Sequence, residues 1–203
     1  MVKKSKKEMK PEEAELIDKW ILILLNSNNN DPIKGRIRFA KDFFLIAEKY
    51  LPELYQISEF YPYHFGPYST RFGVRVNNLR INNFMQSKLV NQDWEYSLTE
   101  KGIQLADTYI KEIAEDLLNK IGNIKKKNKK LKLKALLKDM YIDYPNFAKR
   151  AVRKVEFSSE KVNLANFEKI DDGPGFVASF NSGQREIELK GKAAKLFLKL
   201  ISE

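Results

Sequence analysis

Three prolines, Pro52, Pro62 and Pro67, interrupt the N-terminal half of this chain and constrain its fold more than any other feature. Proline ends or kinks a helix, because it lacks a backbone N–H and its ring clashes with the preceding turn. We therefore expect residues 52–66 to form at most a short helix and a turn. One long continuous helix through this half is excluded, so helices before and after the prolines must pack as separate elements.

Helix patterns lie on both sides of the prolines. Residues 11–25 begin with Pro11, which suits a first helical turn, and their second half is apolar all round, which predicts burial on several sides. Residues 36–50 have a broad apolar arc and a polar edge that includes Lys41 and Asp42. A third helix is expected to start near Pro67 or Ser69, a good N-cap, and to end near Asn83.

The next stretch predicts a hairpin and another helix. Two short strands meet at Asn91-Gln92-Asp93, and Trp94, Tyr96 and Leu98 alternate on one side of the second strand. Thr99 should cap a helix that reaches about residue 121. Three helices, a small hairpin and a helix follow the order of a winged helix-turn-helix. The expected class is α+β and mainly helical, with a helical extension and a small C-terminal hairpin and helix.

The expected organisation has four parts. Residues 1–10 form a flexible basic tail, 11–122 the winged helix-turn-helix, 123–155 a basic linker with a helix over 133–144, and 156–203 a small α+β unit. In that last unit "GFVASF" and "REIELK" predict a hairpin, and "KAAKLFLKLIS" a helix that covers it. A two-stranded hairpin with one helix is marginal alone, so we expect this unit to contribute to a homodimer.

Positive charge is concentrated in one segment. Residues 121–155 carry twelve basic side chains and two acids, so their net charge equals the +10 of the whole chain. Such a field suits a surface that meets an anionic polymer, although a solvated lysine linker is the alternative.

The third helix carries the residues predicted to read DNA. On a helical wheel Arg71, Arg75, Asn78 and Asn82 form one polar stripe, and no acid occurs in residues 60–92. Arginine recognises guanine and asparagine adenine in the major groove, so this stripe predicts duplex-DNA binding; an ordinary exposed helix is the alternative. The expected phosphate contacts lie outside the stripe. They are Arg80 and Lys88, together with Lys125, Lys126, Lys127, Lys129 and Lys130 of a lysine-rich run that ends at Lys134.

Several segments resemble a known family. "GRIRFAKDFFLI", "FYPYHFGPYS", "YSLTEKG" and "LLKDMYIDYPNF" are similar to the YwgA-like family of winged-helix proteins, and more distantly to Panacea-type antitoxin domains. The resemblance covers residues 12–149. It implies a winged helix with a helical extension and a regulatory role, and it supplies no catalytic residues. A protein-interaction module, such as an antitoxin or a defence-system adaptor, is the alternative function.

The residues offer little for catalysis. The chain has no cysteine, and its one histidine, His64, is a poor zinc site alone and is expected to be structural. Asp171 and Asp172 with Glu188-Leu189-Lys190 resemble the acids and lysine of Mg²⁺-dependent nucleases, but Glu-x-Lys arises readily by chance here. We expect no enzyme activity, cofactor or metal. A charged N-terminus and the lack of a membrane-spanning apolar run predict a cytoplasmic protein.

Overall fold

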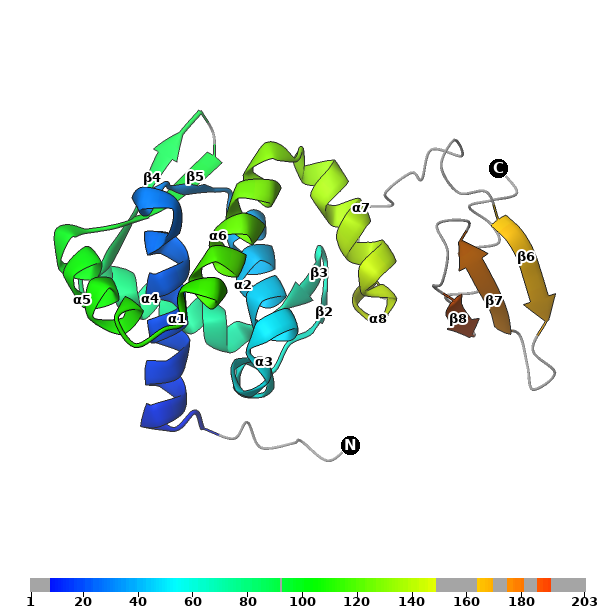
Figure 1. The fold of residues 1–203 in the computed structure, drawn as a ribbon, viewed down its shortest axis with the longest axis horizontal. Helices are drawn as coiled ribbons and strands as arrows, with labels where there is room; N and C mark the ends of the chain where they lie inside the picture. The colour runs from blue at the N-terminus through cyan, green and yellow to red at the C-terminus, as the bar shows by residue number, and fades with distance from the viewer. Residues whose placement is uncertain (1–7, 92, 149–163, 170–174, 181–185, 191–203) are drawn as a thin grey trace. The chain divides into compact units, whose positions relative to one another are not determined.

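The computed structural model describes residues 8–91, 93–148, 164–169, 175–180 and 186–190 (Figure 1). The chain divides into two compact units, Met1–Arg153 and Lys154–Glu203. This division lies beside the expected start of the C-terminal unit at residue 156. Within the described residues the fold is α+β and mostly helical, which confirms the predicted class.

The first unit contains these elements in chain order: α1 (Pro11–Asn30), β1 (Ile33–Lys34), α2 (Arg36–Tyr50), α3 (Pro52–Ser58), β2 (Tyr61–Tyr63), β3 (Gly66–Tyr68), α4 (Thr70–Ile81), β4 (Met85–Val90), β5 (Asp93–Leu98), α5 (Glu100–Ile110), α6 (Glu115–Lys130), α7 (Leu133–Asp143) and α8 (Pro145–Ala148). The second unit contributes β6 (Leu164–Lys169), β7 (Gly175–Phe180) and β8 (Glu186–Lys190), which form an antiparallel sheet in the order β6-β7-β8. Strand β6 was not predicted, and the predicted helix after β8 lies outside the described residues.

Two helices, α1 and α2, are deeply buried in the first unit. The second half of α1 is buried on all sides, as predicted, and its regular helix ends near Asn26 because Asn28 and Asn29 are left-handed, with φ of 57°. In α2 every side chain from Phe39 to Ala47 is buried. The predicted polar edge at Lys41 and Asp42 is therefore wrong, since their exposed fractions are 2% and 0%.

Strands β2 and β3 form a hairpin where only a turn was expected. Pro62 pairs with Pro67, between the pairs Tyr61–Tyr68 and Tyr63–Gly66. In an antiparallel ladder, hydrogen-bonded residue pairs alternate with pairs that form no backbone hydrogen bond. Two prolines opposite each other can therefore occupy a pair of the second kind without losing a hydrogen bond. The prolines thus stop the helix and remain compatible with a strand.

Strand β5 joins the hairpin β4–β5 to β1, giving a three-stranded antiparallel sheet in the order β1-β5-β4. Tyr96 and Leu98 are buried as their alternation predicts, whereas Trp94, nearer the hairpin end, is 46% exposed. Helix α4 begins at the predicted N-cap, since the Ser69 hydroxyl accepts a hydrogen bond from Phe72 N. Helix α4 contacts strand β4 of this sheet, and it lines a pocket together with the start of α2 (Figure 1).

The single helix predicted from Thr99 to residue 121 is two helices. α5 ends at Ile110, and α6 begins at Glu115 and continues to Lys130. The lysine-rich run from Lys125 to Lys130 is therefore the end of a packed helix and not a linker. Helix α7 ends at Asp143, just before Pro145, as predicted.

Candidate functional site

The two arginines predicted to read DNA bind acids of the same chain. Arg71 is buried, and its Nη1 donates to Glu13 Oε2 at 3.0 Å and to Ile57 O at 2.8 Å, while its Nη2 lies 2.8 Å from Glu59 Oε1. Arg75 forms a two-pronged ion pair with Asp18, with Nε 2.8 Å from Oδ1. The hydrogen bond to Asp18 raises the pKa of Arg75.

The prediction that Arg71 and Arg75 face outward is therefore wrong. On α4 alone they look like a solvent stripe, but α1 places Glu13 and Asp18 against this stripe. Their guanidinium groups are bonded to these carboxylates, so neither is available to contact bases in the major groove of DNA.

The other predicted residues on and after α4 remain accessible. Asn82 is exposed at the end of α4, where its Nδ2 donates to Asn78 O at 2.9 Å, and Asn78 itself is half-buried. Arg80 and Lys88 are exposed. The face that α4 turns outward carries Thr70, Val74, Asn77 and Ile81, which the wheel did not single out.

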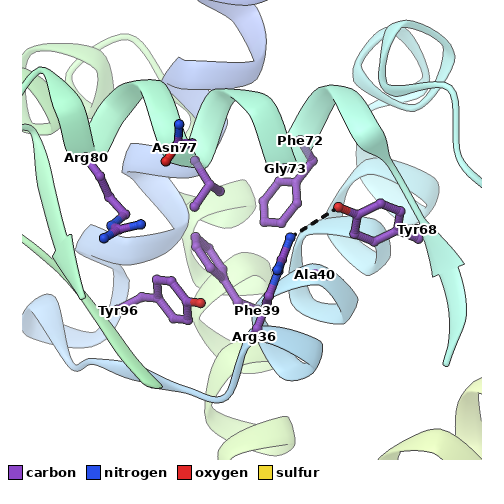
Figure 2. A pocket seen from close by; sticks show the side chains of 10 residues that line it. Arg36, Phe39, Ala40, Tyr68, Phe72, Gly73, Asn77, Arg80 and Tyr96 are labelled. Carbon is purple, nitrogen blue, oxygen red and sulfur yellow. Dashed lines mark hydrogen bonds between the residues drawn. The ribbon is translucent and has the colours of Figure 1, made fainter. Parts of the chain in front are cut away.

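A pocket of about 250 Å³ lies between α4, the first turns of α2, and strand β5 (Figure 2). Its lining residues come from four elements: Arg36, Phe39, Ala40, Tyr68, Phe72, Gly73, Val76, Asn77, Arg80 and Tyr96. None of them is an acid. Figure 2 shows Arg36 and Arg80 reaching it from α2 and α4, with the rings of Phe39, Phe72 and Tyr96 among them.

Gly73 explains how Tyr68 fits against α4. A Cβ at position 73 would lie 2.7 Å from the Tyr68 hydroxyl, so a larger residue would push that ring away. The hydroxyl accepts a hydrogen bond from Arg36 Nη2 at 3.4 Å (Figure 2). The glycine inside the helix, which costs about 1 kcal/mol relative to alanine, thus makes room for the residue that contacts Arg36.

The electrostatics of the pocket are positive. Burial raises the pKa of the Tyr96 hydroxyl, and the nearby charges of Arg36 and Arg80 oppose that rise. Among the described residues neither arginine has a carboxylate within ion-pair distance. Arg36, Tyr68, Asn77 and Tyr96 were not predicted as residues of one site, because only the tertiary structure brings them together.

The lysine-rich run divides into buried and exposed members. Lys125 is buried, and its Nζ donates to Leu25 O at 2.8 Å and Ser27 O at 2.7 Å, at the C-terminal end of α1. A cation suits this negative end of a helix. Burial lowers the pKa of Lys125 to about 8. Its predicted contact with phosphate is therefore wrong, since the ammonium is buried and already bonded.

The remaining lysines of the run are exposed. Lys129 pairs with Asp31 at 2.6 Å, whereas Lys126, Lys127 and Lys130 have no such partner among the described residues. The end of α6 is fixed to the start of α2 by Arg38, which donates to Leu131 O at 3.0 Å and also to Asn128 O.

Asp42 completes this junction. Asn128 Nδ2 donates to Asp42 Oδ1 at 2.6 Å, while Asp42 Oδ2 is buried without a hydrogen-bond partner. Burial raises the pKa of Asp42 to about 7, against the opposing effects of Asn128, Arg38 and Lys125. The junction thus holds the exposed lysines of α6 near the first turn of α2, which also carries Arg36.

The described residues among those weighed for catalysis are His64, Glu188 and Lys190. His64 is exposed between β2 and β3, and its ring lies 4.3 Å from that of Tyr63. No group of three histidine or acidic side chains that could hold a metal occurs in the part of the chain that the structure describes. Asp171 and Asp172 lie outside that part, and Glu188 and Lys190 are in β8.

No described helix is long and apolar enough to cross a membrane. Neither a protein-family model nor a curated protein sequence matches this chain.

Proposed function

We propose that the protein binds duplex DNA as a winged-helix protein and acts as a transcriptional regulator, not as an enzyme. The order α1, β1, α2, α4, β4, β5, with β1 paired to β5, supports the winged-helix assignment. In this assignment α4 is the reading helix and the hairpin β4–β5 the wing. Helix α3 and the hairpin β2–β3 then enlarge the turn between α2 and α4.

The observation that carries the proposal is the set of unpaired cations around α4. Arg36, Arg80 and Lys88 have no ion-pair partner among the described residues, although the chain holds 27 acids. Unpaired, accessible cations are the groups that neutralise phosphates. On the outward face of α4, Asn77 offers an amide to adenine, and Val74 and Ile81 offer apolar contact to thymine methyl groups.

The end of α6 adds positive charge from a distant part of the sequence. Arg38 and Asp42 hold this end against α2, and Lys126, Lys127 and Lys130 are exposed on it with no ion-pair partner in the described part of the chain. We assign these three lysines to contacts with the phosphate backbone, which strengthen binding without selecting sequence.

A titration of duplex DNA tests the assignment of α4. Asn77→Ala/Arg80→Ala should weaken binding by at least tenfold, because the lost base contact of Asn77 costs roughly 1–3 kcal/mol and the phosphate contact of Arg80 is lost with it. The matched control is Lys111→Ala/Asn119→Ala, which removes one charge just after α5 and one amide on α6, both at exposed positions, and should leave binding unchanged. Equal weakening in both pairs would contradict a reading role for α4.

A salt series tests the phosphate contacts. For binding through phosphates, the logarithm of the association constant falls with the logarithm of salt concentration, with a slope of about −0.9 per phosphate neutralised. Replacing Lys126, Lys127 and Lys130 by glutamine should make this slope shallower. If the parent protein has no measurable affinity for duplex DNA at low salt, the proposed function is wrong.

A protein-interaction module is the second candidate. Its support is the exposure of large apolar side chains on the same elements, with Ile81 at 73% and Leu89 at 64%. Leu89 lies opposite the exposed Trp94 in the hairpin β4–β5. A partner protein that docks on these side chains would bind with little salt dependence and would be lost on Leu89→Asp, whereas DNA binding would survive in part.

A further inference from the structure

The pocket beside α4 joins an aromatic floor to two arginines that form no ion pair with any described residue. Its floor contains the buried rings of Phe39, Phe72 and Tyr96. The centre of the Phe39 ring lies 5.1 Å from that of Phe72 and 5.2 Å from that of Tyr96. Because these rings are part of the hydrophobic core, the floor exists before any ligand binds.

The polar groups of the pocket are suited to an anion. Arg36 and Arg80 supply guanidinium groups, and Tyr68 and Tyr96 supply hydroxyls (Figure 2). Guanidinium donors form their strongest hydrogen bonds with carboxylate and phosphate oxygens. No acidic side chain lines the pocket, so these charges have no internal counter-ion there.

Size and lining together select the class of ligand. A volume of about 250 Å³ is below the range of roughly 300–1,000 Å³ typical for drug-sized ligands. It therefore suits one ring and one charged group better than a nucleotide. An aromatic floor favours a ring over a bare inorganic ion, because ring contacts add to the charge pairing.

We propose that this pocket binds a small aromatic carboxylate, with the carboxylate on Arg36 and Arg80 and the ring on Phe39 and Phe72. The proposal requires only the pocket and not DNA binding, so it can hold or fail independently of the proposed function.

Calorimetry on the unmodified full-length protein gives the first test, with three probes at constant ionic strength. Benzoate should bind at least tenfold more tightly than benzamide, which keeps the ring and removes the charge. Benzoate should also bind more tightly than inorganic phosphate, which keeps a charge and removes the ring. Equal binding of benzoate and benzamide would overturn the proposal, and so would tighter binding of phosphate.

Substitutions then locate the site. Arg36→Gln and Arg80→Gln should each weaken benzoate binding by at least tenfold, and Arg36→Lys should recover only part of the loss, because lysine lacks the planar fork. Lys111→Gln, outside the pocket, is the matched control and should leave the affinity unchanged. Thermal unfolding of each variant confirms that it is folded.

Nuclear magnetic resonance gives a readout that does not depend on stable variants. In the unmodified protein, benzoate should shift the side-chain Nε–H signals of Arg36 and Arg80 and leave those of Arg71 and Arg75 in place, since the latter are held by Glu13 and Asp18. Shifts confined to other residues would place the ligand elsewhere and overturn the assignment.

Discussion

At the scale of single residues, the charges of this chain serve two different purposes. Arg71 and Arg75 join α4 to α1 through Glu13 and Asp18. Arg36 and Arg80 have no such partners among the described residues and line a pocket. Residue type alone does not separate these two groups, whereas burial and partners do.

Arg71→Ala should destabilise the fold. The substitution removes a hydrogen bond to Ile57 O and the ion pair with the half-buried Glu13 carboxylate. Hydrogen bonds to charged groups contribute about 1.5–3 kcal/mol each, so a loss of this order in the free energy of unfolding is expected. Urea unfolding measures it. Arg80→Ala, at an exposed position of the same helix, is the control and should change stability by less than about 0.5 kcal/mol.

Asp42 should make stability depend on pH. Burial raises its pKa in the folded state to about 7 from its ordinary value of 3.8, so between these pH values the folded state binds a proton that the unfolded state has released. Stability contributed by this group therefore falls as pH rises from about 4 to 7.

Asp42→Asn isolates that effect, because asparagine keeps an acceptor for Asn128 and cannot ionise. As pH rises through the same window, the free energy of unfolding of the parent should fall relative to that of this variant. Urea unfolding at a series of pH values measures the difference. A difference that stays constant from pH 4 to 7 would show that Asp42 ionises in the folded state as it does in the unfolded chain.

At the scale of elements, the sequence predicts the helices α1, α2 and α4 and the hairpin β4–β5, and it predicts the orientation of α4 poorly. The caps at Ser69 and Thr99 and the break at Pro145 were readable because each acts through local backbone chemistry. The outward face of α4 was not readable. A wheel for one helix cannot show that Glu13 and Asp18, more than fifty residues earlier, lie against its polar stripe.

The same limit applies to α2 and to the pocket. Lys41 was expected on the exposed polar edge of its helix, but its Nζ donates to Pro67 O at 2.6 Å inside the fold. Burial lowers the pKa of Lys41 to about 7. Arg36 and Tyr96 are sixty residues apart and meet only because β1 pairs with β5. Contacts of this kind depend on tertiary packing, which no local pattern encodes.

The glycine of the segment "LTEKG" should be irreplaceable for a structural reason. A Cβ at Gly102, in the first turn of α5, would lie 1.8 Å from Phe84 O, a backbone atom that also accepts a hydrogen bond from Thr99 N. Gly102→Ala must therefore push α5 away from the start of β4, at a cost of about 1–3 kcal/mol or more.

Gly73→Ala, in α4, is the matched comparison. Its Cβ would meet only the hydroxyl of Tyr68, at the far end of a side chain that can move, and alanine is the better helix former. Its thermal midpoint should stay within a few degrees of the parent's, while that of Gly102→Ala falls clearly below. Equal losses in the two variants would mean that Tyr68 is as rigid as the backbone.

At the scale of the whole molecule, the two compact units differ in how well each is expected to fold alone. The first unit contains a core built from α1, α2, α4 and the sheet β1-β5-β4, with residues such as Ile21, Phe43 and Phe72 almost fully buried. The second unit has fifty residues, Lys154–Glu203, and chains of this size are marginal when they fold alone.

Truncation after Arg153 tests this division. The first unit should unfold cooperatively with nearly the thermal midpoint of the full chain, because its core residues all precede Lys154. Light scattering on the same samples tests the proposed role of the second unit in self-association. If the full chain is a dimer and the truncated chain a monomer, that role is supported. An unchanged ratio of measured to monomer mass would contradict that role, and the second unit would then serve the fold or another partner.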